Sequence, residues 1–134
     1  GPGHVCGPAF KKPQLADAAS GFRIAKETSR LDIGQTVVVR NGTVLAVEAF
    51  EGTNKCILRG GELGRGKDVM LVKVSKPNQD MRFDVPVIGP HTIEKCAEAG
   101  VANIAVEAGM TLVLEKEKVA ELCAKHGIGL HAVQ

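Results

Sequence analysis

Two carboxylates and a guanidinium lie close together in the chain, within the run SKPNQDMRFDVPVIGP at residues 75–90. If residues 81–85 are extended, alternation places Asp80, Arg82 and Asp84 on one face of a strand. Paired carboxylates suit Mg²⁺, which completes its coordination shell with water and substrate phosphate. Arg82 could offset the repulsion between them or bind a phosphate through two parallel hydrogen bonds. We interpret Asp80 and Asp84 as candidate catalytic and metal-binding residues, with a solvated surface ion-pair cluster as the alternative.

Other polar residues around this run are candidates for binding a phosphorylated substrate. Lys73 and Lys76 flank the end of the buried run DVMLVKV, either as phosphate ligands or as an ordinary charged strand terminus. A place between a strand and a helix favours a ligand site, because open α/β sheets bind ligands where their strands end. Acidic residues at strand ends, such as Glu107, are more often surface acids than ligands. The candidate substrate-binding residues are Lys73, Lys76, Gln79, Arg82, Thr53 and Glu107.

A second segment rich in glycine and cations is RGGELGRGK at residues 59–67. Its glycines could let backbone amides and cations close over phosphate oxygens, or could form a mobile loop with solvated charges. Their spacing fits neither the P-loop nor the dinucleotide-binding pattern. The segment alone is therefore a weak indication of phosphate binding.

Alternating strand and helix patterns predict the elements that position these residues. Two β-branched runs separated by Asn41-Gly42 predict a hairpin, because both residues tolerate the positive φ of a type I′ turn. The expected elements are helix 14–31, hairpin strands 35–39 and 43–49, a helix from residue 53, strand 68–74, helix 91–100, strands 102–107 and 111–114, helix 115–126 and strand 128–133. This order predicts an α/β fold, a mixed β-sheet with packed helices, in a single domain preceded by a helix and a β-hairpin.

The chain has 134 residues, enough for one domain with a core of its own. Residues 1–13 are rich in proline and glycine and have no periodic pattern. We interpret them as a tag or a disordered linker, which leaves the folded domain at residues 14–134.

Composition argues against several classes of function. Aromatic residues make up 3% of the chain and the net charge is +2, so neither a base-stacking platform nor a phosphate-backbone footprint is expected. The four cysteines and four histidines lack metal-ligand spacing, which favours free buried thiols in a reducing cytosol over a zinc site. No apolar run approaches the ~20 residues of a membrane span. We expect a cytoplasmic protein.

Three blocks of the chain agree in order with one known family: LDIGQTVVVRNGTVLAVEAFEGT, KPNQDMRFDVPVIGPHTIEKCAEAG and GVANIAVEAGMTLVLEKE. They resemble the C-terminal domain of the LpxI family, the UDP-2,3-diacylglucosamine pyrophosphatases of lipid A biosynthesis in Gram-negative bacteria. The resemblance implies hydrolysis of UDP-2,3-diacylglucosamine with Mg²⁺, which gives UMP and 2,3-diacylglucosamine 1-phosphate. It also implies catalysis by an aspartate of this domain, for which Asp80 is our first choice over Asp84.

The resemblance also implies an N-terminal domain, which family members carry and this chain lacks. If the family's site lies between the two domains, we expect the isolated chain to fold but to turn over poorly or not at all. A lipid-linked substrate implies peripheral contact with the inner membrane. The low aromatic content fits an acyl-chain pocket lined by Val, Ile, Leu and Ala, and it fits an ordinary core equally well.

Two other classes of function fit the same residues. A non-catalytic module for a lipid or a nucleotide sugar would bind such a ligand without hydrolysing it. A domain that only dimerises would use the exposed edge of the Asn-Gly hairpin.

Overall fold

The computed structural model describes residues 3–76 and 86–134, which form a six-stranded mixed sheet with packed helices. The strand order is β1-β8-β6-β4-β2-β3, and β5 and β7 form a separate two-stranded sheet. The strands are β1 Gly3–Cys6, β2 Thr36–Arg40, β3 Thr43–Val47, β4 Met70–Lys73, β5 Val87–Ile88, β6 Asn103–Glu107, β7 Leu112–Val113 and β8 Gly129–Val133. The helices are α1 Lys12–Arg30, α2 Thr53–Leu63, α3 Pro90–Ala99 and α4 Lys116–His126. The predicted fold class is confirmed. Within the described residues, no helix combines the length and apolar character needed to cross a bilayer.

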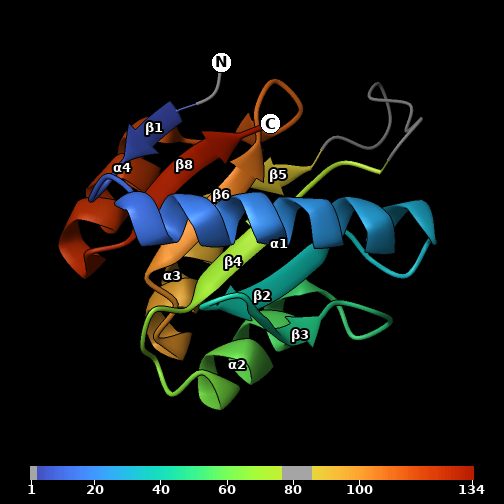
Figure 1. Ribbon diagram of the computed structural model, residues 1–134. Helices are drawn as coiled ribbons and strands as arrows, with labels where there is room; N and C mark the ends of the chain where they lie inside the picture. The colour runs from blue at the N-terminus through green and yellow to red at the C-terminus, as the bar shows by residue number, and fades with distance from the viewer. Residues whose placement is uncertain (1–2, 77–85) are drawn as a thin grey trace.

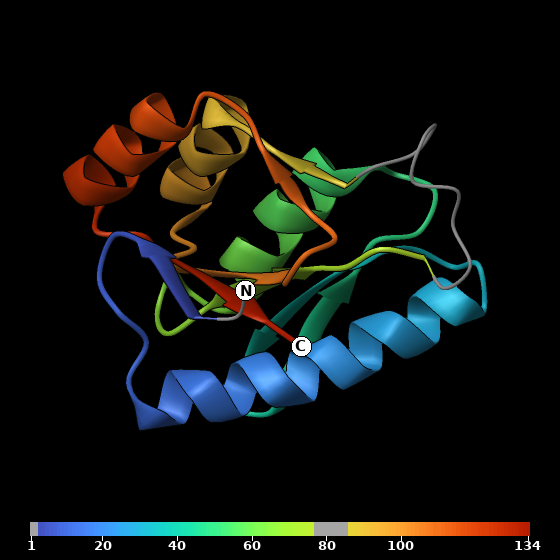
Figure 2. The same cartoon turned by 90° about the horizontal axis from the view of Figure 1, so that it is seen from above.

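Helices cover both faces of the six-stranded sheet (Figures 1 and 2). Among the helices of residues 3–76 and 86–134, α1 alone lies across one face, and α2, α3 and α4 cover the other. Alternation along β2 divides its side chains between two cores: Val37 and Val39 belong to the α1 side, and Val38 belongs to the side of α2. Strands buried on both faces explain why β2 and β4 are continuous apolar runs in the sequence.

The carboxyl ends of three strands meet at one edge of the sheet. Strands β4, β6 and β8 are parallel, with Lys73 paired to Val106 and Glu107 paired to Val133. We call the edge where these strands end the carboxyl edge. Residues 74–76, which follow β4 in the chain and precede the run with the candidate aspartates, lie at this edge.

Residues 3–13 belong to the fold, so the interpretation of residues 1–13 as a tag or disordered linker is wrong for them. Strand β1 pairs antiparallel with β8, with Gly3 opposite Ala132. Phe10 is buried and its ring stacks on that of His131, with centroids 4.7 Å apart. A four-residue strand is too short to show a period, and its partner lies at the other end of the chain.

The predicted hairpin is confirmed, and it is an integral part of the sheet. Asn41 and Gly42 have φ of 48° and 80°, as a type I′ turn requires. Strand β2 pairs with both β3 and β4. The helix and hairpin expected to precede the domain therefore form its α1 layer and one side of its sheet. The strand expected at residues 111–114 is β7, which pairs with β5 outside the main sheet.

The glycine-rich segment is helical in its first part, which corrects the prediction of a loop over residues 59–67. Gly60 and Gly61 are buried within α2. A Cβ on Gly60 would lie 2.5 Å from Val38 Cγ1, and one on Gly61 would lie 2.2 Å from the Ala99 carbonyl oxygen. The glycines let α2 approach β2 and α3 closely. Packing, rather than phosphate binding, accounts for these two residues.

Candidate functional site

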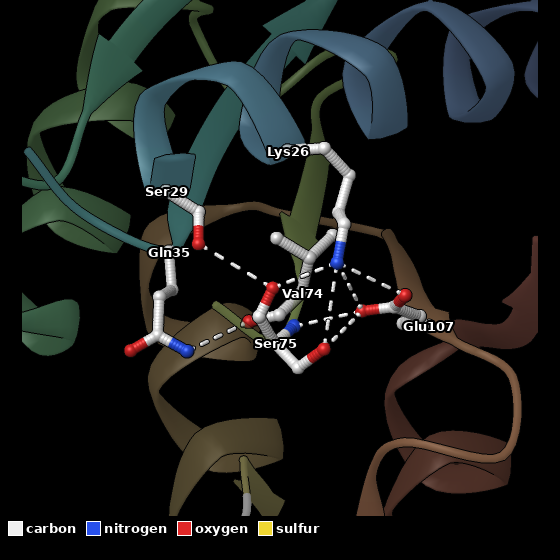
Figure 3. Close-up of polar contacts among 6 residues, drawn as sticks. All are labelled: Lys26, Ser29, Gln35, Val74, Ser75 and Glu107. Carbon is white, nitrogen blue, oxygen red and sulfur yellow. Dashed lines mark hydrogen bonds and ion pairs between the residues drawn. The ribbon is translucent and has the colours of Figure 1, made fainter. Parts of the chain in front are cut away.

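Three polar side chains from distant parts of the chain meet at the carboxyl edge: Lys26, Ser75 and Glu107 (Figure 3). Lys26 extends from α1, Ser75 lies just beyond the end of β4, and Glu107 is the last residue of β6. Parallel pairing of β4 with β6 brings Ser75 and Glu107 together. We call these three residues the edge cluster.

Each polar group of Ser75 has a partner in this arrangement. Its backbone N–H and its hydroxyl donate to Glu107 Oε1, at 2.9 and 2.7 Å. Its carbonyl oxygen accepts from Lys26 Nζ at 2.9 Å and from the Ser29 hydroxyl at 3.4 Å. Lys26 Nζ also lies 3.2 and 3.1 Å from the two carboxylate oxygens of Glu107. Ser75 is 1% exposed, so these bonds replace hydration that burial has removed.

The edge cluster changes the acidity of Glu107. Burial raises the pKa of this carboxyl, but the hydrogen bonds from Ser75 and the ammonium of Lys26 outweigh it, so the pKa is lowered from its ordinary value of 4.5. Glu107 is therefore a carboxylate at neutral pH, bound to a cation and two donors. That state suits a hydrogen-bond acceptor and argues against a general acid.

This lowered pKa predicts how stability depends on acid. The folded state binds fewer protons at Glu107 than the unfolded state, so the carboxylate contributes stability above its ordinary pKa. That contribution is lost as pH falls through the lower folded pKa. We expect the free energy of unfolding in urea to fall more steeply below pH 4.5 in the wild type than in Glu107→Gln. In Lys26→Met, the free energy of unfolding should also fall less steeply below pH 4.5 than in the wild type. Parallel curves in all three proteins would contradict the assignment.

Lys73 and Lys76 lie on the same stretch as Ser75 and have partners. Lys73 Nζ donates to the Val87 carbonyl at 3.3 Å, which connects the end of β4 to β5. Lys76 Nζ lies 2.9 Å from Asp32 Oδ1 in an exposed ion pair. Exposed pairs contribute little to stability, so loss of the Lys76–Asp32 contact by itself would cost little.

Thr53 lies at the same edge of the sheet, further from the cluster. The Thr53 hydroxyl donates to Glu48 at 3.2 Å, and Glu48 N–H donates to the Thr36 carbonyl at 2.9 Å. Thr36 in turn pairs with Lys73 across β2 and β4. Thr53 also begins α2, and the next residue, Asn54, contacts His91 Nε2 at 3.1 Å at the start of α3.

An apolar cavity of about 520 Å³ opens beside the edge cluster. Glu107 belongs to the edge cluster and also lines the cavity. The walls come from β1, β6, β7, β8 and α4. Most of the lining is apolar and includes Val5, Val106, Leu112, Val113, Val119, Ala120 and Ala132, and the polar side chains that line it are Glu107, Thr111, Lys116 and Glu117. A polar cluster next to an apolar hollow suits a ligand with a charged part and a hydrocarbon part.

Comparison with known proteins identifies the family. The profile of the LpxI C-terminal domain matches residues 1–131. The chain belongs to this family. It is 43% identical over 123 residues to UDP-2,3-diacylglucosamine pyrophosphatase LpxI of Caulobacter vibrioides, an alignment that covers 87% of this chain and 43% of that protein. The chain thus spans less than half the length of this curated relative.

Among solved structures, an apo dCMP deaminase from the cyanophage S-TIM5 is similar to this LpxI-type domain with a TM-score of 0.49. The alignment covers 92% of this chain and 100% of that chain, at 15% sequence identity. A similarity at this level carries no argument about function.

Four of the site residues predicted from sequence lie outside the described residues of the LpxI-type domain: Gln79, Asp80, Arg82 and Asp84. Their roles, and Mg²⁺ binding by the two aspartates, stay predictions. Among residues 3–76 and 86–134, no group of three or more His, Cys, Asp or Glu could hold a metal ion.

The sequence did not indicate Lys26 or Ser75. Lys26 lies on a helix that carries several other charges, and only the crossing of α1 over the end of β4 brings it to the edge. The four cysteines are free thiols, and Cys56, Cys96 and Cys123 are buried as expected, whereas Cys6 is half-buried. Burial raises the pKa of Cys56 and Cys96 to about 12, so neither is suited to act as a thiolate nucleophile.

Proposed function

We propose that this domain is the catalytic C-terminal part of a Mg²⁺-dependent hydrolase that cleaves UDP-2,3-diacylglucosamine into UMP and 2,3-diacylglucosamine 1-phosphate. The observation that carries the proposal is the 43% identity to a protein named UDP-2,3-diacylglucosamine pyrophosphatase LpxI. The reaction would serve lipid A biosynthesis. The enzyme would be cytoplasmic and contact the inner membrane peripherally, where its lipid-linked substrate resides.

In this proposal, Asp80 and Asp84 hold Mg²⁺ and help orient the attacking water. Bound Mg²⁺ would neutralise charge on the pyrophosphate and assist the attack of water on phosphorus. Arg82 and Gln79 would bind the pyrophosphate or the adjoining sugar. Lys73 and Lys76, at the end of β4, and Thr53, at the start of α2, would complete the polar part of the site. Cations held near phosphate oxygens stabilise the charge that builds during hydrolysis.

The apolar cavity beside Glu107 is proposed to take an acyl chain of the substrate. Its volume of about 520 Å³ and its wall of Val, Leu and Ala side chains suit a hydrocarbon. The charged headgroup would then lie toward the carboxyl edge, next to Lys73 and Lys76. This arrangement would separate the two halves of an amphipathic substrate between two adjoining surfaces.

The cavity can be tested by filling it from α4. Ala120 lines the cavity, and Ala124, one turn further along, does not. Ala120→Trp is expected to raise KM for the diacylated substrate about tenfold, because the indole occupies space that the acyl chain needs. Ala124→Trp, on the exposed surface of the same helix, is expected to leave KM unchanged. Equal KM values in both variants would exclude this cavity as the acyl site.

The proposed function requires an assay of the two-domain protein, meaning this chain preceded by the N-terminal domain that family members carry. We expect release of UMP from UDP-2,3-diacylglucosamine with Mg²⁺, loss of activity with EDTA, and recovery when Mg²⁺ is restored. Mass spectrometry of the purified protein should find a bound diacylglucosamine phosphate. A ligand bound without any hydrolysis would instead identify a non-catalytic binding module.

A further inference from the structure

The chain leaves β4 through two residues that are hydrogen-bonded to distant parts of the chain. Beyond Lys73, Val74 exchanges two hydrogen bonds with Gln35: its N–H donates to the Gln35 carbonyl and its carbonyl accepts from Gln35 Nε2, both at 3.0 Å. Ser75 follows, with every polar group bonded to Lys26, Ser29 or Glu107. Two consecutive residues outside the strand are therefore held by hydrogen bonds from α1, β6 and the residue before β2 (Figure 3).

The edge cluster brings charge to this fixed point. The Lys26 ammonium and the Glu107 carboxylate lie 3.1 Å apart, and their side chains are 27% and 13% exposed. Lys26 Nζ has three donors and four oxygens within 3.5 Å, namely the Ser75 carbonyl and hydroxyl oxygens and both carboxylate oxygens of Glu107. A largely enclosed pair with this many bonds is costly to break by removing one partner.

From this geometry we propose that Lys26, Ser75 and Glu107 are positioning residues for the hydrolysis, and that they fix the backbone from which the Asp80-bearing run begins. This inference rests on the proposed function. Lys76 directly follows Ser75, and the run 77–85 continues from it. A displacement of about 1 Å in the groups that orient a reactant can cost ~100-fold in rate. If these three residues fix the start of the run, removing one of them should therefore lower kcat.

Glu107 lines the proposed acyl cavity, but a polar contact between its carboxylate and the substrate headgroup is a competing explanation, and the hydrogen bonds of the carboxylate argue against it. Its Oε1 accepts from the Ser75 N–H, the Ser75 hydroxyl and Lys26, and its Oε2 also accepts from Lys26. A substrate hydroxyl or phosphate would have to displace donors that keep Ser75 satisfied in a buried place. The competing explanation predicts that loss of Glu107 weakens binding, whereas positioning predicts that it slows the reaction.

The test compares Glu107→Ala with Glu107→Gln in the two-domain protein. Alanine removes every acceptor, and we expect kcat to fall about 100-fold with KM within threefold of the wild type. Glutamine keeps one oxygen that can accept from Ser75. The kcat of Glu107→Gln should therefore be at least tenfold higher than that of Glu107→Ala. Lys26→Met, which keeps an apolar stem, should lower kcat without raising KM and serves if Glu107→Ala does not fold. The matched control is Glu98→Ala, which breaks the exposed Lys95–Glu98 pair on α3 and should change neither constant.

A second readout separates this inference from the proposed function. Amide hydrogen exchange at Ser75, measured by NMR on this chain, needs no activity. It should speed up at least tenfold in Glu107→Ala, while the amide of Val72 within β4 keeps its rate. Unchanged exchange at Ser75, or a raised KM with normal kcat, would overturn the positioning role. If the wild type shows no hydrolysis, the proposed function fails. Faster exchange at Ser75 would then show that Glu107 holds this backbone, but there would be no reaction for it to serve. That result would also overturn the inference.

Discussion

Replacing Asp80 with asparagine in the two-domain protein is expected to lower kcat for UDP-2,3-diacylglucosamine hydrolysis by at least a thousandfold. The amide has the same shape but carries no charge, so it is a poor ligand for Mg²⁺ and cannot accept a proton from water. Release of UMP at saturating substrate and Mg²⁺ measures the effect. Binding should survive, because the lysines and the apolar cavity are untouched. The variant should therefore copurify with intact substrate, which mass spectrometry would detect.

Two further variants make the Asp80 experiment specific. Asp84→Asn tests the second carboxylate, and a loss of activity in this variant alone would transfer the essential role to Asp84. Asp68→Asn is the control: Asp68 is exposed at the opposite end of β4, and its φ of 56° is one that asparagine adopts readily. It should keep wild-type turnover. Wild-type turnover in Asp80→Asn would refute the assignment of Asp80.

The second large effect is on stability. Gly61→Ala is expected to lower the free energy of unfolding by about 3 kcal/mol, the upper end of the usual cost of overpacking. The new Cβ would lie 2.2 Å from the Ala99 carbonyl oxygen and 2.8 Å from the Ala99 Cβ. Backbone cannot move aside as a flexible side chain can, so α2 and α3 would have to separate. Urea unfolding of this chain, followed by circular dichroism, measures the loss.

Gly89→Ala is the matched control for the helix contact. At Gly89 a Cβ would meet nothing closer than Leu114 Cβ at 3.9 Å, and its φ of −133° is open to any residue. We expect a loss of less than about 1 kcal/mol there, from the poorer helix cap alone. Similar losses in the two variants would show that the closeness of α2 and α3 does not account for Gly61.

Elements defined by local chemistry were predictable from the sequence. The Asn41-Gly42 turn and the α3 helix, with Pro90 in its first turn and Gly100 at φ 76° after its end, depend on residues within a few positions of one another. Gly60 and Gly61 were predicted as loop because glycine usually interrupts a helix. Their role depends on how closely two other elements approach, which no local pattern contains.

The candidate site likewise contains residues that the sequence could identify and residues that only the packing of distant elements brings in. Glu107 and Lys73 could be identified as strand ends, and parallel strands place such residues on one edge. Lys26 could not, because its position depends on where α1 crosses the sheet. The place of the cavity was also beyond prediction, because its walls combine β1 with β7, β8 and α4, and no pattern in residues 1–13 predicted a strand. For Asp80 and Asp84, the sequence and the family are the basis of the assignment.

The place of β8 in the sheet has a consequence for how the domain folds in the cell. β8 is the last strand in chain order, yet it lies inside the sheet, between β1 and β6. Until residues 129–133 have emerged from the ribosome, β6 has an open edge and β1 has no partner. Closing contacts between such distant segments is slow, and open edges invite aggregation. The sheet of the nascent domain therefore cannot close until β8 inserts between β1 and β6.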